Sequence, residues 1–212
     1  MNTNHPATTA VETNSLSVVP PHVVGWSARS AVAAPLLALF AIAVGAPLYT
    51  QDMRTAAATT RLIVANAATL GVLLLLTVAL VGLHLHAGNR LRAPGQVAFV
   101  WALIGTVLAA GGAWDSLFAL PYIAEQAPEM LDVPTGGTLL AGFVVSYLVL
   151  VSGWSTFTIA SVRSGVLPRT PAIVLIIGAV LALLPTPTAL RLLPLAVGAA
   201  LAGRAILTHP QR

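Results

Sequence analysis

The chain has 212 residues, of which 57% are hydrophobic and only 8% are charged, and its mean hydropathy is +0.89. A soluble domain carries about 25% charged residues, so this chain has too few to cover a water-facing surface and is predicted to be an integral membrane protein. It has no cysteine, which excludes disulfides, thiolate metal sites and thiol redox chemistry.

Apolar runs divide the chain into a polar tail, a membrane domain and a short C-terminal tail. Residues 1–28 are polar and contain proline, so a disordered N-terminal tail is predicted there. The transmembrane domain is predicted over 29–208, and residues 209–212 form the C-terminal tail. The predicted spans are 31–49, 61–85, 97–120, 138–162, 172–184 and 189–207. The sequence therefore predicts an all-α, polytopic bundle of six transmembrane helices.

The arginines are distributed unevenly between the two sides that six spans would create. An even number of spans places both termini on one side. That side carries Arg29, Arg90, Arg92, Arg163, Arg169, Arg204 and Arg212, and the other carries Arg54, Arg61 and Arg191. Cytoplasmic loops carry the excess of basic residues, so both termini are predicted to be cytoplasmic, in a cell membrane. The acidic loop over 121–137 is then outside and is expected to lie on the membrane surface.

One carboxylate lies inside a predicted span. Asp115 is the only acidic residue within the six spans, and a carboxylate there is costly unless it faces protein or water. At about 1.5 Å per residue, it lies about 9 Å below Pro121, and Asn66 of the second span lies at a similar depth. Asn66 and Arg61 are therefore the predicted partners of Asp115. An asparagine can hydrogen-bond a protonated carboxyl group, whereas an arginine holds it ionised.

Aromatic residues gather around this carboxylate. Nine of the twelve Phe, Trp and Tyr residues lie between Phe99 and Phe157. At about 100° per residue, those of the third span share one face and those of the fourth span share another. If the faces meet, they form an aromatic pocket that opens outward. Together with the two partners of Asp115, the predicted substrate-binding residues are Trp114, Phe118, Tyr122, Phe143, Tyr147, Trp154, Asn66 and Arg61.

An acid beside aromatic rings indicates a possible enzyme acting on an apolar substrate. A protonated Asp115 could give a proton to an alkene or epoxide, with Glu125 as a second acid or a proton relay, and π faces would stabilise the resulting cation. The segment WDSLF at 114–118 and the aromatic face of the fourth span resemble the small integral-membrane terpene cyclases of bacteria, which protonate isoprenoid chains. This resemblance implies a cyclase or isomerase. No cofactor, metal site or diphosphate-binding motif is predicted.

A non-enzymatic role explains the same residues. Trp114, Tyr122 and Trp26 fit an interfacial belt, and Asp115 could join helices through Asn66. The chain would then be an accessory subunit, a lipid binder or a small proton- or cation-coupled transporter. In either case the expected partners are the lipid bilayer and an apolar small molecule or lipid, with no nucleic acid. Small residues spaced by four, such as Gly105 with Ala109 and Gly142 with Ser146, predict close helix packing.

Overall fold

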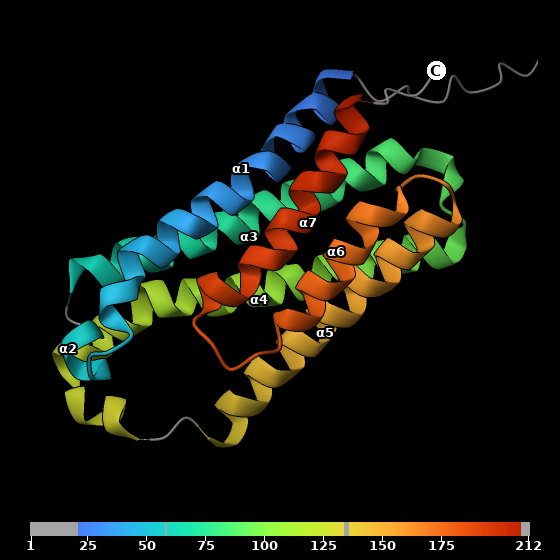
Figure 1. The fold of residues 1–212 in the computed structure, drawn as a ribbon. Helices are drawn as coiled ribbons and strands as arrows, with labels where there is room; N and C mark the ends of the chain where they lie inside the picture. The colour runs from blue at the N-terminus through green and yellow to red at the C-terminus, as the bar shows by residue number, and fades with distance from the viewer. Residues whose placement is uncertain (1–20, 58, 134–135, 209–212) are drawn as a thin grey trace, which may run out of the picture.

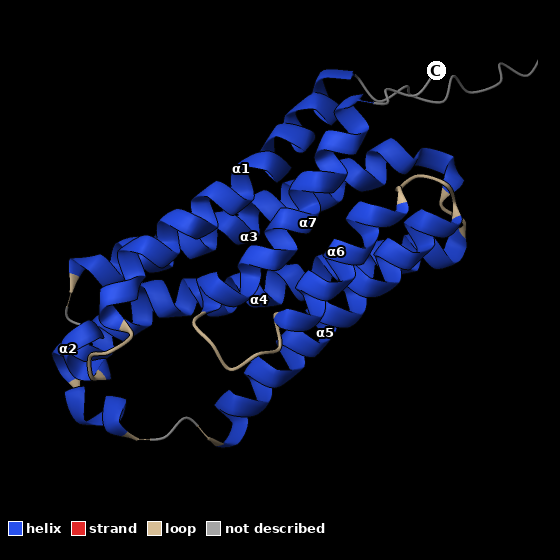
Figure 2. Cartoon of the chain, viewed as in Figure 1, coloured by secondary structure: helices blue, strands red, loops and turns tan. Residues whose placement is uncertain are grey.

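The computed structural model describes residues 21–57, 59–133 and 136–208, which form helices with short connections and no strand (Figures 1 and 2). The helices are α1 (Pro21–Gly45), α2 (Met53–Ala57), α3 (Thr60–Ala87), α4 (Ala93–Gln126), α5 (Gly137–Arg163), α6 (Arg169–Leu181) and α7 (Thr188–Thr208), with the 3-10 turns η1 (Ala46–Leu48), η2 (Gly88–Arg90) and η3 (Pro128–Asp132). The all-α prediction is confirmed for this part of the chain.

Five helical segments are long and apolar enough to cross a membrane. They are Gly25–Leu48, Thr60–Arg90, Ala93–Gln126, Gly137–Arg163 and Thr188–Thr208. Helix α6 is apolar too, but it has only 13 residues and is about 20 Å long, less than the roughly 30 Å of a hydrocarbon core. The described chain is thus an all-helical bundle with five candidate membrane-spanning helices.

The described helices other than α2 form a closed ring. Each of α1, α3, α4, α5, α6 and α7 packs on the next along the chain, and α7 returns to α1. The start of α1 and the end of α7 lie side by side (Figure 1), and a Cβ atom on Gly203 would lie 3.0 Å from the Ala28 carbonyl oxygen. The largest side chains in the core are Trp154, Phe157, Leu73, Leu76, Leu80, Leu150, Leu175, Leu192 and Leu195, each less than 2% exposed. Both described ends of the chain therefore lie at one end of the ring.

Helix α1 packs through small side chains. Ala31, Ala34 and Ala38 recur at helical spacing and are at most 2% exposed. On the facing helix α3, a Cβ atom on Gly82 would lie 2.0 Å from Cβ of Ser27, so the two helices touch backbone to side chain. Lipid tails are as apolar as leucine, so close van der Waals packing of this kind takes the place of the hydrophobic effect between helices.

Helix α1 begins earlier than the sequence predicts. It starts at Pro21, so residues 21–28 are helical instead of belonging to the predicted tail. The physical reason lies at Ser27, which is only 6% exposed and whose hydroxyl donates to the Val23 carbonyl at 2.9 Å. This bond satisfies the hydroxyl, so the polar residue can be buried against α3. Residues 1–20 and 209–212, the rest of the predicted tails, lie outside the described residues.

Helix α4 continues past the point where the third span was predicted to end. It runs through Pro121 to Gln126, so the predicted loop over 121–137 begins six residues later. A proline removes one backbone donor and disturbs the preceding turn, and it is tolerated in a membrane helix when neighbours satisfy the freed groups. Pro121 frees the Leu117 carbonyl, four residues earlier; the Asn66 side-chain amide of α3 donates to the adjacent Ser116 carbonyl at 2.9 Å and so ties this part of α4 to α3.

Candidate functional site

Two glycines bring α4 and α5 into backbone contact. A Cβ atom on Gly105 would lie 2.4 Å from the backbone of Leu150, and one on Gly153 would lie 2.5 Å from Cα of Ala102. Both residues are therefore glycine because no side chain fits between the helices. The close packing predicted at Gly105 is confirmed. Gly112 lies seven residues after Gly105, and a Cβ atom there would lie 3.2 Å from the ring of Phe143.

Beyond this crossing a groove of about 270 Å³ lies between α4 and α5. Asp115, Phe143 and Tyr147 line it, and we call it the Asp115 groove. Gly111 and Gly142 keep it open, because no atom lies within 4 Å of an ideal Cβ at either position. The close contact predicted at Gly142 is therefore wrong. The remaining lining residues are Leu108, Ala109, Gly112, Thr138, Leu139 and Ser146.

The predicted aromatic wall of α4 does not line this groove. Trp114, Phe118 and Tyr122 are 57%, 55% and 65% exposed and lie on the outer surface of the bundle. The rings of Trp114 and Phe118 pack on each other with centroids 5.0 Å apart. Successive residues on a helix point about 100° apart, so Asp115 faces the groove while its neighbour Trp114 does not.

Trp154 is also placed away from the groove. It is fully buried, and its indole N–H donates to the Thr106 hydroxyl of α4 at 3.0 Å. Trp154 thus joins α4 to α5 in the core. Of the predicted set, the structure brings together Asp115, Phe143 and Tyr147.

The predicted partners of Asp115 make other contacts. Asn66 bonds to the Ser116 backbone, as described above, and not to the Asp115 carboxyl. Arg61 is exposed and makes no ion pair or side-chain hydrogen bond with the described residues. Glu125 is exposed near the end of α4, outside the groove. Asp115 is itself exposed, so the groove is open along its length to the surroundings of the bundle.

Arg191, which contributes to the predicted topology only as a charge on one side of the membrane, contacts a residue that lines the groove. The guanidinium carbon of Arg191, from α7, lies 3.8 Å from the centroid of the Tyr147 ring. One terminal nitrogen donates to the Thr188 hydroxyl at 3.1 Å, while Nε is buried with no hydrogen-bond partner among the described residues. The attraction between a cation and the face of an aromatic ring is stronger when the cation is shielded from water. The position of Arg191 inside an apolar span was the sequence signal that could have singled it out.

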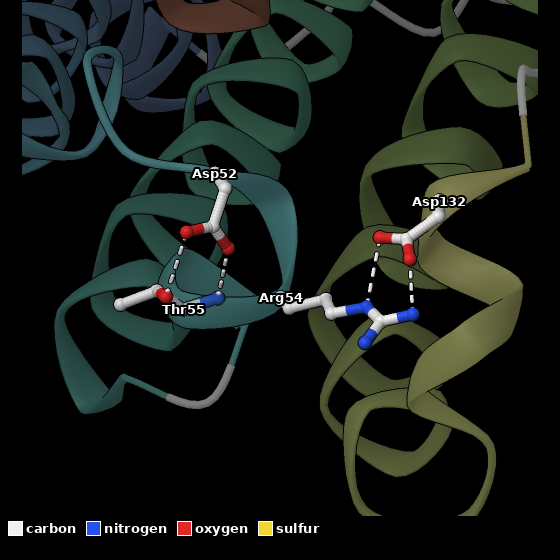
Figure 3. A network of polar contacts seen from close by, with 4 residues as sticks. All are labelled: Asp52, Arg54, Thr55 and Asp132. Carbon is white, nitrogen blue, oxygen red and sulfur yellow. Dashed lines mark hydrogen bonds and ion pairs between the residues drawn. The ribbon is translucent and has the colours of Figure 1, made fainter.

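The acidic end of the bundle is held together by polar contacts between α2 and η3 (Figure 3). Arg54 pairs with Asp132 through two hydrogen-bonding contacts, one of them from Nε to Oδ1 at 2.8 Å. Asp52 accepts hydrogen bonds from the Thr55 backbone N–H at 2.8 Å and from its hydroxyl at 3.0 Å. This is an N-cap interaction, which starts the short helix α2.

The cap predicts a pH effect at Asp52. Its two hydrogen bonds from Thr55, led by the backbone N–H, hold the pKa of Asp52 below its ordinary value. A carboxyl group with a lowered folded-state pKa stabilises the fold above its unfolded pKa, and this contribution is lost as the pH falls through the folded-state pKa. We expect a carboxyl-detected NMR titration in micelles to give a higher pKa for Asp52 in Thr55→Val. Thr50→Val, which removes a neighbouring hydroxyl not bonded to Asp52, should leave the pKa unchanged.

The Asp115 groove offers one carboxyl group, two aromatic rings and nearby hydroxyls. These groups can bind an apolar molecule with a polar or cationic head, or give a proton to it. Within the described ranges, no group of three or more His, Cys, Asp or Glu side chains could hold a metal ion. A scan against protein-family models and searches of curated proteins and of solved structures found no match.

Proposed function

We propose that the chain crosses the membrane six times and has both termini in the cytoplasm. The ring of six helices, each packed on the next along the chain, supports this topology. Helix α6 and its flanking turns form the shorter crossing. The end of the ring that holds the start of α1 and the end of α7 carries Arg29, Arg90, Arg92, Arg163, Arg169 and Arg204. The described acidic residues lie toward the other end, as expected for a cytoplasmic basic side.

The proposed function is binding of an apolar molecule that enters the Asp115 groove from the bilayer. The supporting observation is that Asp115, Phe143 and Tyr147 line one groove between α4 and α5. Ligand pockets usually measure about 300 Å³ or more, so a groove of about 270 Å³ can take a head group and the first part of an apolar chain. The rest of the molecule would lie along the exposed apolar surface of the two helices. This function fits a lipid binder or an accessory subunit.

A membrane-embedded cyclase or isomerase is the second candidate. The observation that favours it is the position of Asp115 in the same groove as two aromatic rings, where a proton donor and π faces would meet a substrate. The groove has fewer aromatic rings than were predicted to stabilise a carbocation, because Trp114 and Phe118 are exposed and Trp154 is buried in the core. Binding is therefore the better supported of the two functions.

Photolabelling tests the binding proposal. The protein in nanodiscs is irradiated with a diazirine analogue of geranylgeraniol, and the labelled peptides are mapped by mass spectrometry. We expect labels on the segments around Gly111 and Gly142. Gly142 lines the groove and no atom lies within 4 Å of its Cβ position, so Gly142→Leu places a side chain in the groove and should reduce labelling about tenfold. Gly25→Leu, another glycine with no atom near its Cβ position, should leave it unchanged. Labels spread over all lipid-facing helices, equally in both variants, would contradict the proposal.

Variants of Asp115 separate the two functions. Asp115→Leu removes the polar anchor and should weaken labelling by about 10- to 100-fold, since a hydrogen bond to a charged group contributes about 1.5–3 kcal/mol. Asp115→Asn keeps the size and the hydrogen-bonding capacity and should retain labelling. If the wild type also converts isoprenoid alcohols or epoxides, Asp115→Asn should abolish the product, whereas Glu129→Gln should not. Labelling without any product in the wild type would leave binding as the function.

A further inference from the structure

A second and larger groove lies between α4 and α5 near the other end of the same helix pair. It measures about 1240 Å³ and is lined by residues from η2, the start of α4 and the end of α5. Three of its lining residues are arginines: Arg90, Arg92 and Arg163. We call it the arginine groove. The Asp115 groove shares none of its residues, so nothing below depends on the function proposed above.

Among the described residues, no acidic side chain neutralises the positive charge of this groove. Arg90, Arg92 and Arg163 are exposed, and the one ion pair among the described residues joins Arg54 to Asp132 near the opposite end. The described carboxylates lie toward that opposite end, on α4 after the crossing or in the connections near it. Three guanidinium groups around one groove therefore attract an anion. Their planar N–H donors suit phosphate oxygens, which they can contact in pairs.

The groove is apolar away from the arginines. Val97 and Trp101 of α4 and Ile159 of α5 line it. The indole N–H of Trp101 donates to the Ser152 hydroxyl of α5 at 2.9 Å, which fixes the ring between the two helices. Arg92, the residue before α4, and Trp101 of α4 are nine residues apart, or about 14 Å along the helix axis. That distance is close to the roughly 15 Å thickness of one leaflet of the hydrocarbon core.

We propose that the arginine groove binds an anionic phospholipid of the leaflet that faces this end. Its phosphate group contacts Arg90, Arg92 and Arg163, and one acyl chain lies along Val97, Trp101 and Ile159. The apolar part of the groove decides between a lipid and a soluble phosphate, because a soluble anion would leave that part uncovered. A zwitterionic lipid presents its phosphate with an attached cation, which three arginines disfavour.

Native mass spectrometry of the full chain tests this lipid site. The protein is released from nanodiscs that contain equal amounts of phosphatidylglycerol and phosphatidylcholine, and the retained lipid is identified. We expect the wild type to retain phosphatidylglycerol in preference. The triple variant Arg90→Gln, Arg92→Gln, Arg163→Gln should bind it about 100-fold more weakly, at about fivefold per arginine near a membrane surface.

The matched control removes the same charge from the same end of the bundle. This control is the triple variant Arg29→Gln, Arg169→Gln, Arg204→Gln, which changes three exposed arginines that do not line the groove. It should retain the preference for phosphatidylglycerol within about threefold. If the first triple variant does not fold, Ala160→Trp keeps every arginine and fills the apolar part of the groove. It should reduce retained phosphatidylglycerol about tenfold.

Three results would overturn the proposal. One is a wild type with no preference for phosphatidylglycerol. Another is an equal loss in both triple variants, which would assign the effect to the overall charge of this end. The third is displacement of phosphatidylglycerol by soluble glycerol 3-phosphate together with full retention in Ala160→Trp, which would identify a site for a free phosphate. The two grooves share no residue, so failure of the Asp115 groove proposal does not affect this test.

Discussion

Gly153→Ala is expected to destabilise the bundle by about 1–3 kcal/mol, although alanine is the better helix former. The added methyl group would lie 2.5 Å from Cα and 2.6 Å from the backbone nitrogen of Ala102, and neither helix can move one atom without moving its neighbours. Gly105→Ala should act in the same direction, since its methyl group would lie 2.4 Å from the backbone of Leu150. Thermal unfolding in detergent, followed by tryptophan fluorescence, measures the effect.

Gly142→Ala is the control for this prediction. Gly142 lies on the same helix α5, but no atom lies within 4 Å of its Cβ position. The substitution should therefore stabilise the protein slightly, by up to about 1 kcal/mol, through the helix propensity of alanine. Opposite signs at Gly153 and Gly142 are the expected outcome. The described contact between α4 and α5 would be wrong if both substitutions stabilised the protein by similar amounts.

Trp154→Ala is expected to have the largest effect of any single truncation discussed above, about 3–5 kcal/mol. Trp154 is fully buried among the core side chains, so its removal leaves a cavity where α4 and α5 meet. The Thr106 hydroxyl also loses the hydrogen bond that the indole N–H donates to it at 3.0 Å. Thr106→Val keeps the packing but leaves that N–H without a partner, which should cost about 1–3 kcal/mol.

Trp114→Ala is the matched control on the surface. Trp114 is 57% exposed and packs mainly on Phe118, so its truncation should change the stability far less than Trp154→Ala. The double variant Trp154→Phe, Thr106→Val should be more stable than the sum of its single variants predicts, because both partners of the buried hydrogen bond are then gone. Equal effects of Trp154→Ala and Trp114→Ala would show that Trp154 is not the core residue described above.

The helices and their relative depths could largely be predicted from the sequence. Apolar runs of membrane length marked each of the long helices, and α6 was predicted to be short. Counting along the helices also placed Asn66 next to the right part of α4, since its side chain bonds to the backbone of Ser116, the residue after Asp115. Rise per residue is a property of the helix itself, so positions along the axis follow from counting.

The faces of the helices could not be predicted in the same way. In a soluble protein, polar residues mark the outer face of a helix. In a membrane-type helix the side that faces lipid and the side that faces protein are both apolar. The sequence shows which residues share a face, but not whether that face contacts lipid or another helix. Trp114 and Trp154 were predicted to line one pocket, yet one is exposed and the other is buried. The predicted aromatic pocket depended on this assignment.

Composition and apolar run lengths alone predicted an all-helical chain with helices of membrane length and one carboxylate inside one of the apolar runs. The packing of the helices was needed to show that the glycines at 105 and 153 bring α4 and α5 together, and that grooves remain between the two helices on either side of this crossing. Composition and helical rise act within one helix. Grooves form between two helices, and their positions depend on where the two backbones touch. An apolar stretch of sequence does not specify these contact points.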